Sequence, residues 1–395
     1  MEMKKEEIEE LCQKIMVSIL VVIPLIGTAA AMVLLWNRYV FPSDIILLVA
    51  FYGLTVIGIT VGYHRMLTHH GFESHPLVRA VLLILGAMSF EGPPDRWAAT
   101  HIKHHAHSDQ EEDPHTPIGG FWHAHMGWLF SNRNFVEAKE YAPHLLKDPV
   151  VMFVSRWVPL WSALSLILPF LLGGWTGLLW GGAVRIFLVN HVTWSVNSVC
   201  HVFGKHPFLT ADASRNHWIV GLLAFGEGWH NNHHAFPPNA FHGLHWWQFD
   251  LAGLIIRGME RLGLMWNVRR VSKESVRKTL SKADQVRQTL MELRDEVLLN
   301  IQEARQTLAE LITDAKGRIP PGFQKGGLAM FGAVQKDAME SLEKIQRRLI
   351  RLHHIKQQQI LDYQIEIQDL IQSARDRIQA GLRRNSTDIF PSSPF

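Results

Sequence analysis

The sequence predicts an all-α integral membrane protein with about four transmembrane helices, a cytoplasmic helical cap that holds a two-metal site, and a polar helical tail. Hydrophobic residues make up 47% of the 395 residues and charged residues 19%, whereas soluble proteins have roughly 25% charged residues. All 14 Trp lie before residue 270, while more than half of the Lys and Arg follow it. Of the 23 histidines, all but His353 and His354 lie between His64 and His245.

Four apolar stretches are long enough to cross a bilayer, which takes roughly 20 helical residues. They lie at residues 15–36, 44–63, 153–172 and 175–199. Residues 77–90 are apolar but shorter, and Arg79 and Glu91 bound them, so we expect an interfacial or re-entrant segment there. The loops within the two pairs of spans are short, and the long segments outside the pairs carry nearly all the Lys and Arg. The positive-inside rule therefore predicts that both termini and these long segments are cytoplasmic.

The pattern divides the chain into four parts. Residues 1–14 form an acidic amphipathic segment that lacks the basic region and cleavage site of a signal peptide, and residues 15–268 form the membrane domain. In residues 269–384 apolar side chains recur at steps of three and four, which predicts two long helices in a hairpin or coiled coil. Residues 385–395 are expected to be disordered.

Composition and motifs exclude several functions. The net charge of +3 is too small to indicate nucleic-acid binding. Cys12 and Cys200 are far apart, so they form neither a disulfide framework nor a cysteine zinc site. The sequence has no H-E-x-x-H, no Gly-rich phosphate loop and no dinucleotide fingerprint.

Four short motifs contain clustered His residues and one Asn, and they lie near the predicted cytoplasmic ends of the spans or in cytoplasmic segments. They are His64-x4-His69, His101-x2-His104-His105, Asn197-x3-His201 and His230-x2-His233-His234. Residues i, i+3 and i+4 of a helix share one face, so each H-x2-H-H motif presents three imidazoles to one side. His64 and His69 are five residues apart and should point apart on an α-helix, so we expect them to contact two different metals.

The number of imidazoles indicates two metals. Imidazole binds Zn, Cu, Fe and Ni, and a structural zinc site closes with four ligands. Nine histidines and Asn197 exceed that number, whereas two metals with four or five ligands each would use them all. A metal-transport or buffering protein is an alternative, but such proteins more often carry irregular His-rich tracts.

These motifs resemble those of the membrane-bound acyl desaturases of the stearoyl-CoA Δ9 class, above all the acyl-lipid Δ9 branch. The shared features are H-R-x3-H, H-x2-H-H followed by Asp113-Pro114-His115, N-S-x2-H and G-E-G-W-H-N-x-H-H, within residues 15–268. The H-x4-H spacing of the first motif differs from the H-x3-H of Δ12-type desaturases. The resemblance implies an enzyme that uses O2, two electrons and two non-haem irons to insert a cis double bond, at Δ9, into a saturated acyl chain.

The resemblance also implies a division of the ligands. One iron would be held by His64, His101, His104 and His233, with Asn197 through a water. The other would be held by His69, His105, His201, His230 and His234. Asp109, Asp113 and Glu227 are expected to orient the ligating rings. Trp97 and Trp229 are expected to line the acyl tunnel, with ordinary packing as the alternative for both.

The partners follow from the same resemblance. No His-Pro-Gly-Gly haem motif is present, so the electrons are expected from an external donor such as a ferredoxin. The acyl carrier stays open between a lipid, coenzyme A and a carrier protein. The tail lies outside the family's pattern and is expected to form homo-oligomers, to dock a partner, or to be a solvated appendage. Two other functions stay open: a hydroxylase or other oxygenase on the same scaffold, and a non-catalytic metal-binding membrane protein.

Overall fold

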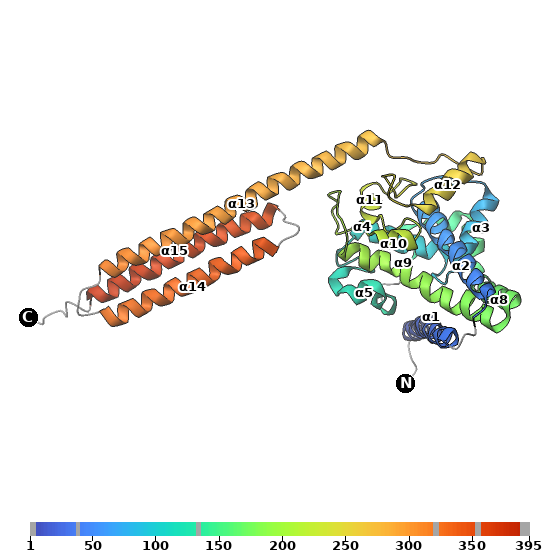
Figure 1. Cartoon of the computed structure of the whole chain (residues 1–395), viewed down its shortest axis with the longest axis horizontal. Helices are drawn as coiled ribbons and strands as arrows, with labels where there is room; N and C mark the ends of the chain where they lie inside the picture. Colours follow the sequence, from blue (N-terminus) through green and yellow to red (C-terminus); the bar gives the residue numbers. More distant parts are fainter. Residues whose placement is uncertain (1–4, 37–39, 132–135, 319–323, 352–356, 388–395) are drawn as a thin grey trace, which may run out of the picture. The chain divides into compact units, whose positions relative to one another are not determined.

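The computed structural model describes the chain except residues 1–4, 37–39, 132–135, 319–323, 352–356 and 388–395 (Figure 1). The chain forms two compact units, Met1–Leu280 and Ser281–Phe395, called here the membrane unit and the tail unit. The division falls inside helix α13 (Lys273–Gly317), later than the expected boundary after residue 268. Of the end expected to be disordered, 385–395, residues 388–395 lie outside the described residues, and helix α15 continues to Thr387.

Three helical segments among the described residues are long and apolar enough to cross a membrane: Lys14–Leu35, Pro42–Thr68 and Val158–Val202. The first belongs to α1 (Lys5–Trp36). The second joins α2 (Pro42–Ile57) to the π-helix η1 (Gly58–Thr68). The third joins α8 (Val158–Gly177), the π-helix η6 (Leu178–Val184) and α9 (Arg185–Val202).

The third segment reverses direction at Gly174. Its backbone angles there, φ 62° and ψ −147°, suit glycine because a Cβ would be strained. The buried Arg185 donates from Nη2 to the Ser165 carbonyl oxygen at 3.1 Å, whereas twenty residues of straight helix would separate these groups by about 30 Å. The segment is therefore a helical hairpin, which accords with the third and fourth predicted spans. The count of four membrane crossings stays a prediction.

Helix α3 (Pro76–Ala87) packs against η1 and, with 12 residues, is too short to cross a bilayer. Gly58 permits this contact, since a Cβ there would lie 2.1 Å from the Gly86 backbone nitrogen. Beyond this pair, seven short helices contact η1, α9 or one another. They are α4 (Pro94–His107), α5 (Phe121–His125), α6 (Ala138–Tyr141), α7 (Pro149–Arg156), α10 (Trp218–Leu223), α11 (His230–Ala235) and α12 (Leu251–Arg261).

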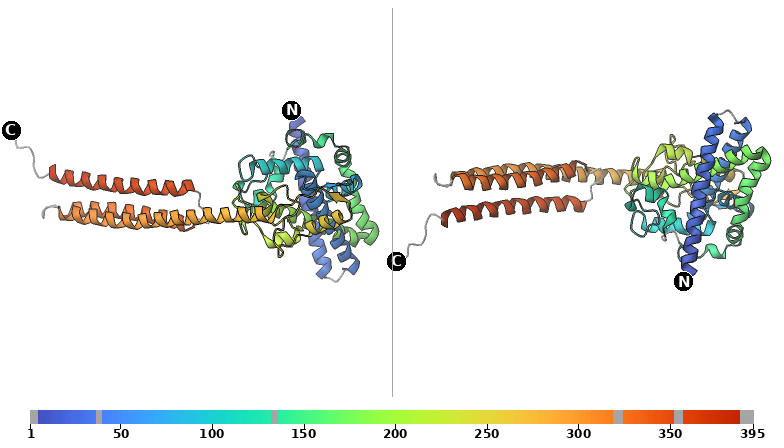
Figure 2. Two further views of the ribbon diagram at one scale, coloured as in Figure 1. Left: turned by 90° about the horizontal axis from the view of Figure 1, so that it is seen from above. Right: turned by 90° about the horizontal axis from the view of Figure 1, so that it is seen from below.

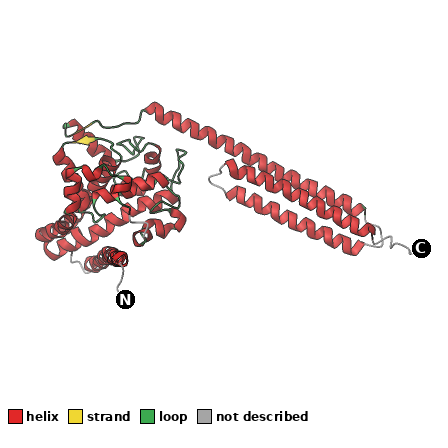
Figure 3. Cartoon of the chain, turned by 180° about the vertical axis from the view of Figure 1, so that it is seen from behind, coloured by secondary structure: helices red, strands yellow, loops and turns green. Residues whose placement is uncertain are grey.

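Most of the described chain is helical (Figure 3). The strands β1 (Glu73–Ser74) and β2 (Met265–Trp266) pair antiparallel, with Glu73 opposite Trp266. This pairing ties the end of η1 to the segment after α12. The largest buried cluster lies in the same region and includes Tyr63, Leu83 and Ile256.

The tail unit is a three-helix bundle, so the predicted hairpin of two long helices is wrong. Helices α13, α14 (Gln324–Arg351) and α15 (Gln357–Thr387) run side by side (Figure 2). One buried cluster joins Leu308, Val334 and Ala374 from the three helices, and another joins Val297, Leu342 and Ile367. The sequence between α14 and α15 contains neither Pro nor Gly, so the periodic pattern gave no sign of a second break.

Candidate metal centre

The first histidine motif lies at the end of a π-helix, and this geometry corrects the expectation for His64 and His69. The backbone N–H of His69 donates to the carbonyl of His64 at 3.1 Å, which is the i to i+5 hydrogen bond of a π-helical turn. Residues five apart therefore lie closer to one face than in an α-helix, where they are about 140° apart. Their ring centroids lie 4.8 Å apart, so both rings face the same site.

The ring nitrogens of nine histidines gather in two groups. In the five-histidine group the ligand atoms lie within 4.8 Å of one another, and its members are His64, His69, His101, His105 and His233. The ligand atoms of the four-histidine group meet the same limit, and its members are His104, His201, His230 and His234. All nine histidines singled out from the sequence are thus brought together.

The division between the groups differs from the one that the resemblance implied. His69 and His105 lie with His64, and His104 lies in the other group. In each H-x2-H-H motif the residues at i and i+4 serve one group and the residue at i+3 serves the other. The rotation of 100° per residue places i and i+4 about 40° apart, while i+3 lies about 100° from i+4. Helices α4 and α11 therefore each contribute to both groups.

The Nε2 atoms converge within each group. In the five-histidine group the Nε2 of His101 lies 3.1 Å from that of His69 and 3.0 Å from that of His105. In the four-histidine group the Nε2 of His230 lies 3.0 Å from that of His201 and 3.0 Å from that of His234.

Four carboxylates contact the opposite ring nitrogens, Nδ1. The distances are 2.5 Å for His64 and Glu227, 2.9 Å for His104 and Asp113, 3.0 Å for His201 and Asp109, and 2.8 Å for His234 and Asp212. Asp109, Asp113 and Glu227 were singled out from the sequence for contacts of this kind. Asp212 was missed, because no motif surrounds it and the fold alone brings it beside His234.

These contacts test whether the groups suit metal ions. A carboxylate beside Nδ1 keeps the ring proton there, which leaves a lone pair on Nε2. Burial lowers the pKa of His101, His104 and His230 well below the usual range, so these rings are neutral. The buried Nε2 of His104 has no hydrogen-bond partner among the residues that the structure describes. Converging lone pairs cannot satisfy one another, whereas a cation bound between them would, so both groups fit a metal with imidazole ligands.

Behind Glu227 lies a buried ionic network. The guanidinium of Arg65 donates from Nε to Glu227 at 3.1 Å and from Nη1 to Asp250 at 3.0 Å. Burial would raise the pKa of Glu227, but His242, His64 and Arg65 outweigh it and hold that pKa well below the usual range. Glu227 is therefore ionised and accepts a hydrogen bond from His64. Asp250 also accepts from the backbone N–H of His242 at 2.9 Å, which joins this network to the segment before α12.

Two cavities meet at the five-histidine group. The inner cavity, of about 40 Å³, lies between η1 and α9, and its walls include Thr60, His64 and Ala224. The outer cavity, of about 340 Å³, extends toward α1. Trp97, His101, Thr193 and Asn197 line both cavities.

The two tryptophans singled out from the sequence differ in position. Trp97 lines both cavities, and its indole is stacked on the ring of His101 with centroids 5.2 Å apart. Among the described residues that line these cavities, Trp229 is absent. Its indole packs against Gly221 and donates to the Phe249 carbonyl at 2.8 Å, so ordinary packing accounts for it.

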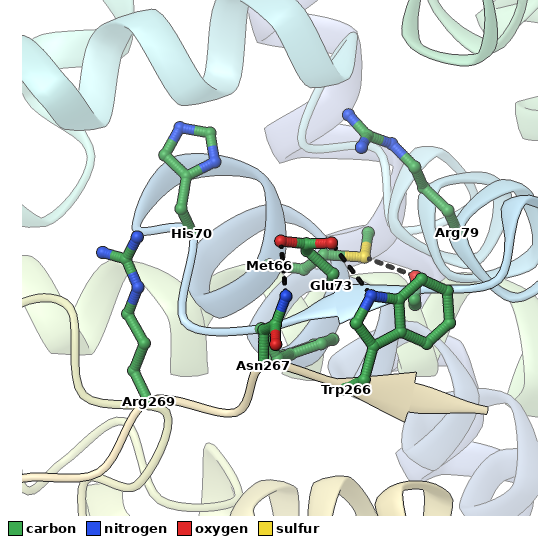
Figure 4. A pocket seen from close by; sticks show the side chains of 9 residues that line it. Met66, His70, Glu73, Arg79, Trp266, Asn267 and Arg269 are labelled. Atoms are coloured by element: carbon green, nitrogen blue, oxygen red, sulfur yellow. Dashed lines mark hydrogen bonds between the residues drawn. The ribbon is translucent and has the colours of Figure 1, made fainter. Parts of the chain in front are cut away.

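A separate pocket of about 660 Å³ lies beside the β1–β2 pair (Figure 4). Glu73 accepts from Trp266 at 2.9 Å and from Asn267 at 3.0 Å, and His70 and Arg269 also line the pocket. None of the nine grouped histidines is among the described residues that line it. It is therefore distinct from the two cavities at the histidine groups.

Comparison with known proteins decides the family. The model of the family "Fatty acid desaturase" matches residues 43–268, which include all nine grouped histidines and the four carboxylates. The chain belongs to the fatty acid desaturase family. This desaturase is therefore an oxidoreductase of membrane-type architecture, and the tail unit lies outside the matched region.

The relatives of this desaturase differ in substrate. It is 42% identical to the hex-5-enoyl-[acyl-carrier protein] acetylenase of Moorena producens over 63% of this chain and 84% of the relative. It is 40% identical to the sn-1 stearoyl-lipid 9-desaturase of Anabaena variabilis over 55% of this chain and 80% of the relative. It is also 40% identical to the acyl-CoA C20 Delta5-desaturase of Anemone leveillei over 56% of this chain and 72% of the relative.

Proposed function

We propose that this desaturase inserts a cis double bond, at Δ9, into a saturated acyl chain whose reacting methylenes reach the inner cavity. The observation that carries the proposal is the convergence of buried Nε2 lone pairs beside that cavity, since His64 and His230 line it and belong to different groups. Two non-haem iron ions held by the two groups would supply the O2-dependent oxidation. The overall reaction joins O2, two electrons, two protons and the two hydrogens of adjacent methylenes, and yields the alkene and two waters.

The residues of the chain have separate tasks in this proposal. The nine histidines would hold the irons, with Asn197 beside the inner cavity as a further ligand through a water. Asp109, Asp113, Asp212 and Glu227 would fix the ring orientations through Nδ1. Trp97 would form the wall that holds the chain against the five-histidine group. Val56, Ile59 and Val196, which also line the inner cavity, would exclude water from the methylenes.

We also propose the orientation and partners that the sequence predicts. The histidine groups and both termini would face the cytoplasm, because the segments that carry them hold most of the Lys and Arg. A soluble carrier such as a ferredoxin would supply the electrons there. The tail unit would associate with further copies of the chain or with a partner protein.

Expression in a desaturase-deficient cell tests the function. Fatty acids are analysed for double-bond position by mass spectrometry, beside the variants His105→Ala and His234→Ala and the control His70→Ala, which alters a histidine outside both groups. The expected result is cis-9 monoenes with the parent chain and the control, and none with the other two variants. Double bonds at another position would overturn the Δ9 assignment. Hydroxylated chains would favour the oxygenase, and iron binding without any product would favour the non-catalytic protein.

A further inference from the structure

A further pocket, of about 530 Å³, reaches both histidine groups and is separate from the inner and outer cavities. His69 and His105 of the five-histidine group line it, and so does His234 of the four-histidine group. None of these three is among the described residues that line the inner or the outer cavity. The rings of His105 and His234 are stacked with centroids 4.4 Å apart. One opening therefore leads to both groups, and it is called here the Asp212 pocket after a carboxylate in its wall.

The Asp212 pocket opens at the molecular surface. Leu209 lines it and is 44% exposed, and Ala211, which also lines it, is exposed as well. No described residue that lines it belongs to the three candidate membrane spans, whereas Val17, Val56 and Asn197, which line the inner or the outer cavity, all do. The remaining walls are Ile102, Thr210, Ala235, Pro237 and Thr279. An ion can therefore reach the histidines here without passing between the candidate membrane spans.

Oxygen atoms lie beside the imidazoles in this pocket. The Thr210 hydroxyl donates to Oδ1 of Asp212 at 2.8 Å, and Oδ2 of Asp212 lies 2.8 Å from Nδ1 of His234. The Asp212 side chain is 11% exposed and the His234 side chain 1%, so an entering ion meets oxygen before nitrogen. Carboxylate and hydroxyl oxygens attract a hydrated divalent cation, and imidazole suits iron once the ion has shed water. No Lys or Arg is among the described residues that line the pocket.

The other two cavities suit an incoming cation less well. The inner cavity of about 40 Å³ has room for only a few water molecules, and Arg65 already donates to its carboxylate, Glu227, at 3.1 Å. In the outer cavity Arg96 is exposed and repels cations. Burial raises the pKa of Glu91, which also lines the outer cavity, to about 8, so this carboxyl group is largely uncharged at neutral pH. The charges in these walls therefore favour entry of a cation through the Asp212 pocket.

From this arrangement we propose that Fe2+ ions enter and leave both histidine groups through the Asp212 pocket, with the oxygens of Asp212 and Thr210 as their first contact. The acyl chain and the metals then use different openings, and a chain in the inner cavity does not block the exchange of iron. This inference rests on the proposed metal binding by the two groups, and it does not depend on which acyl chain is oxidised.

The first test narrows the pocket. Ala211→Trp places a large side chain in its wall, and the control Ala211→Ser alters the same position with little change in volume. Metal-free full-length protein in detergent receives radioactive Fe2+ without O2 and its uptake is timed, and the release from loaded protein into a chelator is then timed. We expect Ala211→Trp to slow uptake and release by the same factor, roughly tenfold or more, because both directions cross one raised barrier. A lower affinity with the uptake rate of the parent would mean that Ala211 only supports the ligands, and would overturn the proposal.

The inner cavity supplies the competing route. Ala224→Leu fills it and alters no residue that lines the Asp212 pocket, so both rates should stay those of the parent. Slower exchange in Ala224→Leu together with parent rates in Ala211→Trp would place the entry at the inner cavity and overturn the proposal. Absence of bound iron in the parent chain would overturn the metal centre itself, and with it the proposed function.

The second test changes the charge at the mouth of the pocket. Nearby charge steers an incoming ion, so uptake of Fe2+ at low salt should be slower in Ala211→Lys than in Ala211→Glu. This difference should shrink as the salt concentration rises, because salt screens exposed charges. The control pair is Leu262→Lys and Leu262→Glu, at an exposed residue that lines none of the three cavities, and these two variants should differ less. Equal uptake by the two Ala211 variants at low salt would overturn the proposed entry.

Discussion

Asp212 Oδ2 lies 2.8 Å from Nδ1 of His234, although the two residues belong to different segments and share no motif. The same carboxylate group also accepts from the backbone N–H of Ser214 at 3.0 Å. The ring of His234 is therefore held by a carboxylate that is itself fixed, which leaves its Nε2 lone pair directed at the four-histidine group.

The first prediction concerns this contact. Asp212→Asn removes the charge that holds the His234 ring proton on Nδ1, so we expect iron affinity to fall by about 10- to 100-fold. Iron content after purification at graded free Fe2+ measures the effect. Asp284→Asn is the matched control, because Asp284 is an exposed aspartate of the tail unit. Equal iron content in the two variants would show that Asp212 does not support a metal ligand.

The second prediction concerns the buried network of Arg65, Glu227 and Asp250. Asp250→Ala leaves the Arg65 guanidinium buried without its second partner, which typically costs about 3–5 kcal/mol. Glu260→Ala breaks an exposed ion pair with Arg270, which is worth about 0–1 kcal/mol. Thermal unfolding in detergent should therefore show a clearly lower transition for Asp250→Ala alone. A similar transition for both would mean that the network adds nothing to stability.

The third prediction concerns the inner cavity. Ala224 is buried and lines the cavity of about 40 Å³ together with His64 and His230. Ala224→Leu would fill much of this space, so we expect product formation to fall while iron content stays that of the parent. Leu223→Met is the control, since Leu223 is exposed and does not line the cavity. Undiminished desaturation by Ala224→Leu would place the acyl chain elsewhere.

The fourth prediction concerns pH. Burial lowers the pKa of His115 and of His242 to about 4 in the folded protein, whereas an unfolded histidine has a pKa of about 6.5. Between these values the unfolded chain binds more protons than the folded chain, so the free energy of unfolding falls as the pH falls from about 6.5 toward 4. Unfolding of the metal-free protein should therefore need less denaturant at pH 5 than at pH 7.5. An unchanged midpoint would contradict the burial of neutral imidazoles.

The fifth prediction concerns the tail unit. All nine grouped histidines lie in the membrane unit, so a chain that ends at Leu280 should keep the iron content and desaturation of the full chain. If the tail unit joins copies of the protein, light scattering in detergent should also find fewer copies of the shortened chain in each particle than of the full chain. Leu308→Asp, which places a charge in the tail core, should likewise reduce the number of copies in each particle. Loss of iron from the shortened chain would assign the tail to the metal centre.

Much of the architecture follows from local patterns that the sequence contains. The apolar stretches predict membrane helices because a helix must match the thickness of the bilayer. The shared face of i, i+3 and i+4 places the imidazoles of His101, His104 and His105 together whatever surrounds them. Asp109, Asp113 and Glu227 were within reach of prediction because they flank the histidine motifs.

Other features depend on contacts between distant segments. The π-helical turn that brings His64 and His69 to one site departs from the α-helical period that the spacing of the motif implies. The loop that carries Asp212 reaches His234 only in the folded chain. The third helix of the tail unit follows a segment without Pro or Gly, so no helix-breaking residue in the sequence indicates where this helix begins.

By itself the sequence determined which residue types are available, which stretches are apolar enough for a membrane and which histidines share a helical face, because these depend on composition and helical period alone. The tertiary structure decided how nine histidines divide into two groups, which carboxylate faces which Nδ1, and that α1 forms a wall of the outer cavity. These depend on side chains that converge from segments far apart in the chain. The spacing of residues within one helix carries no information about such long-range contacts.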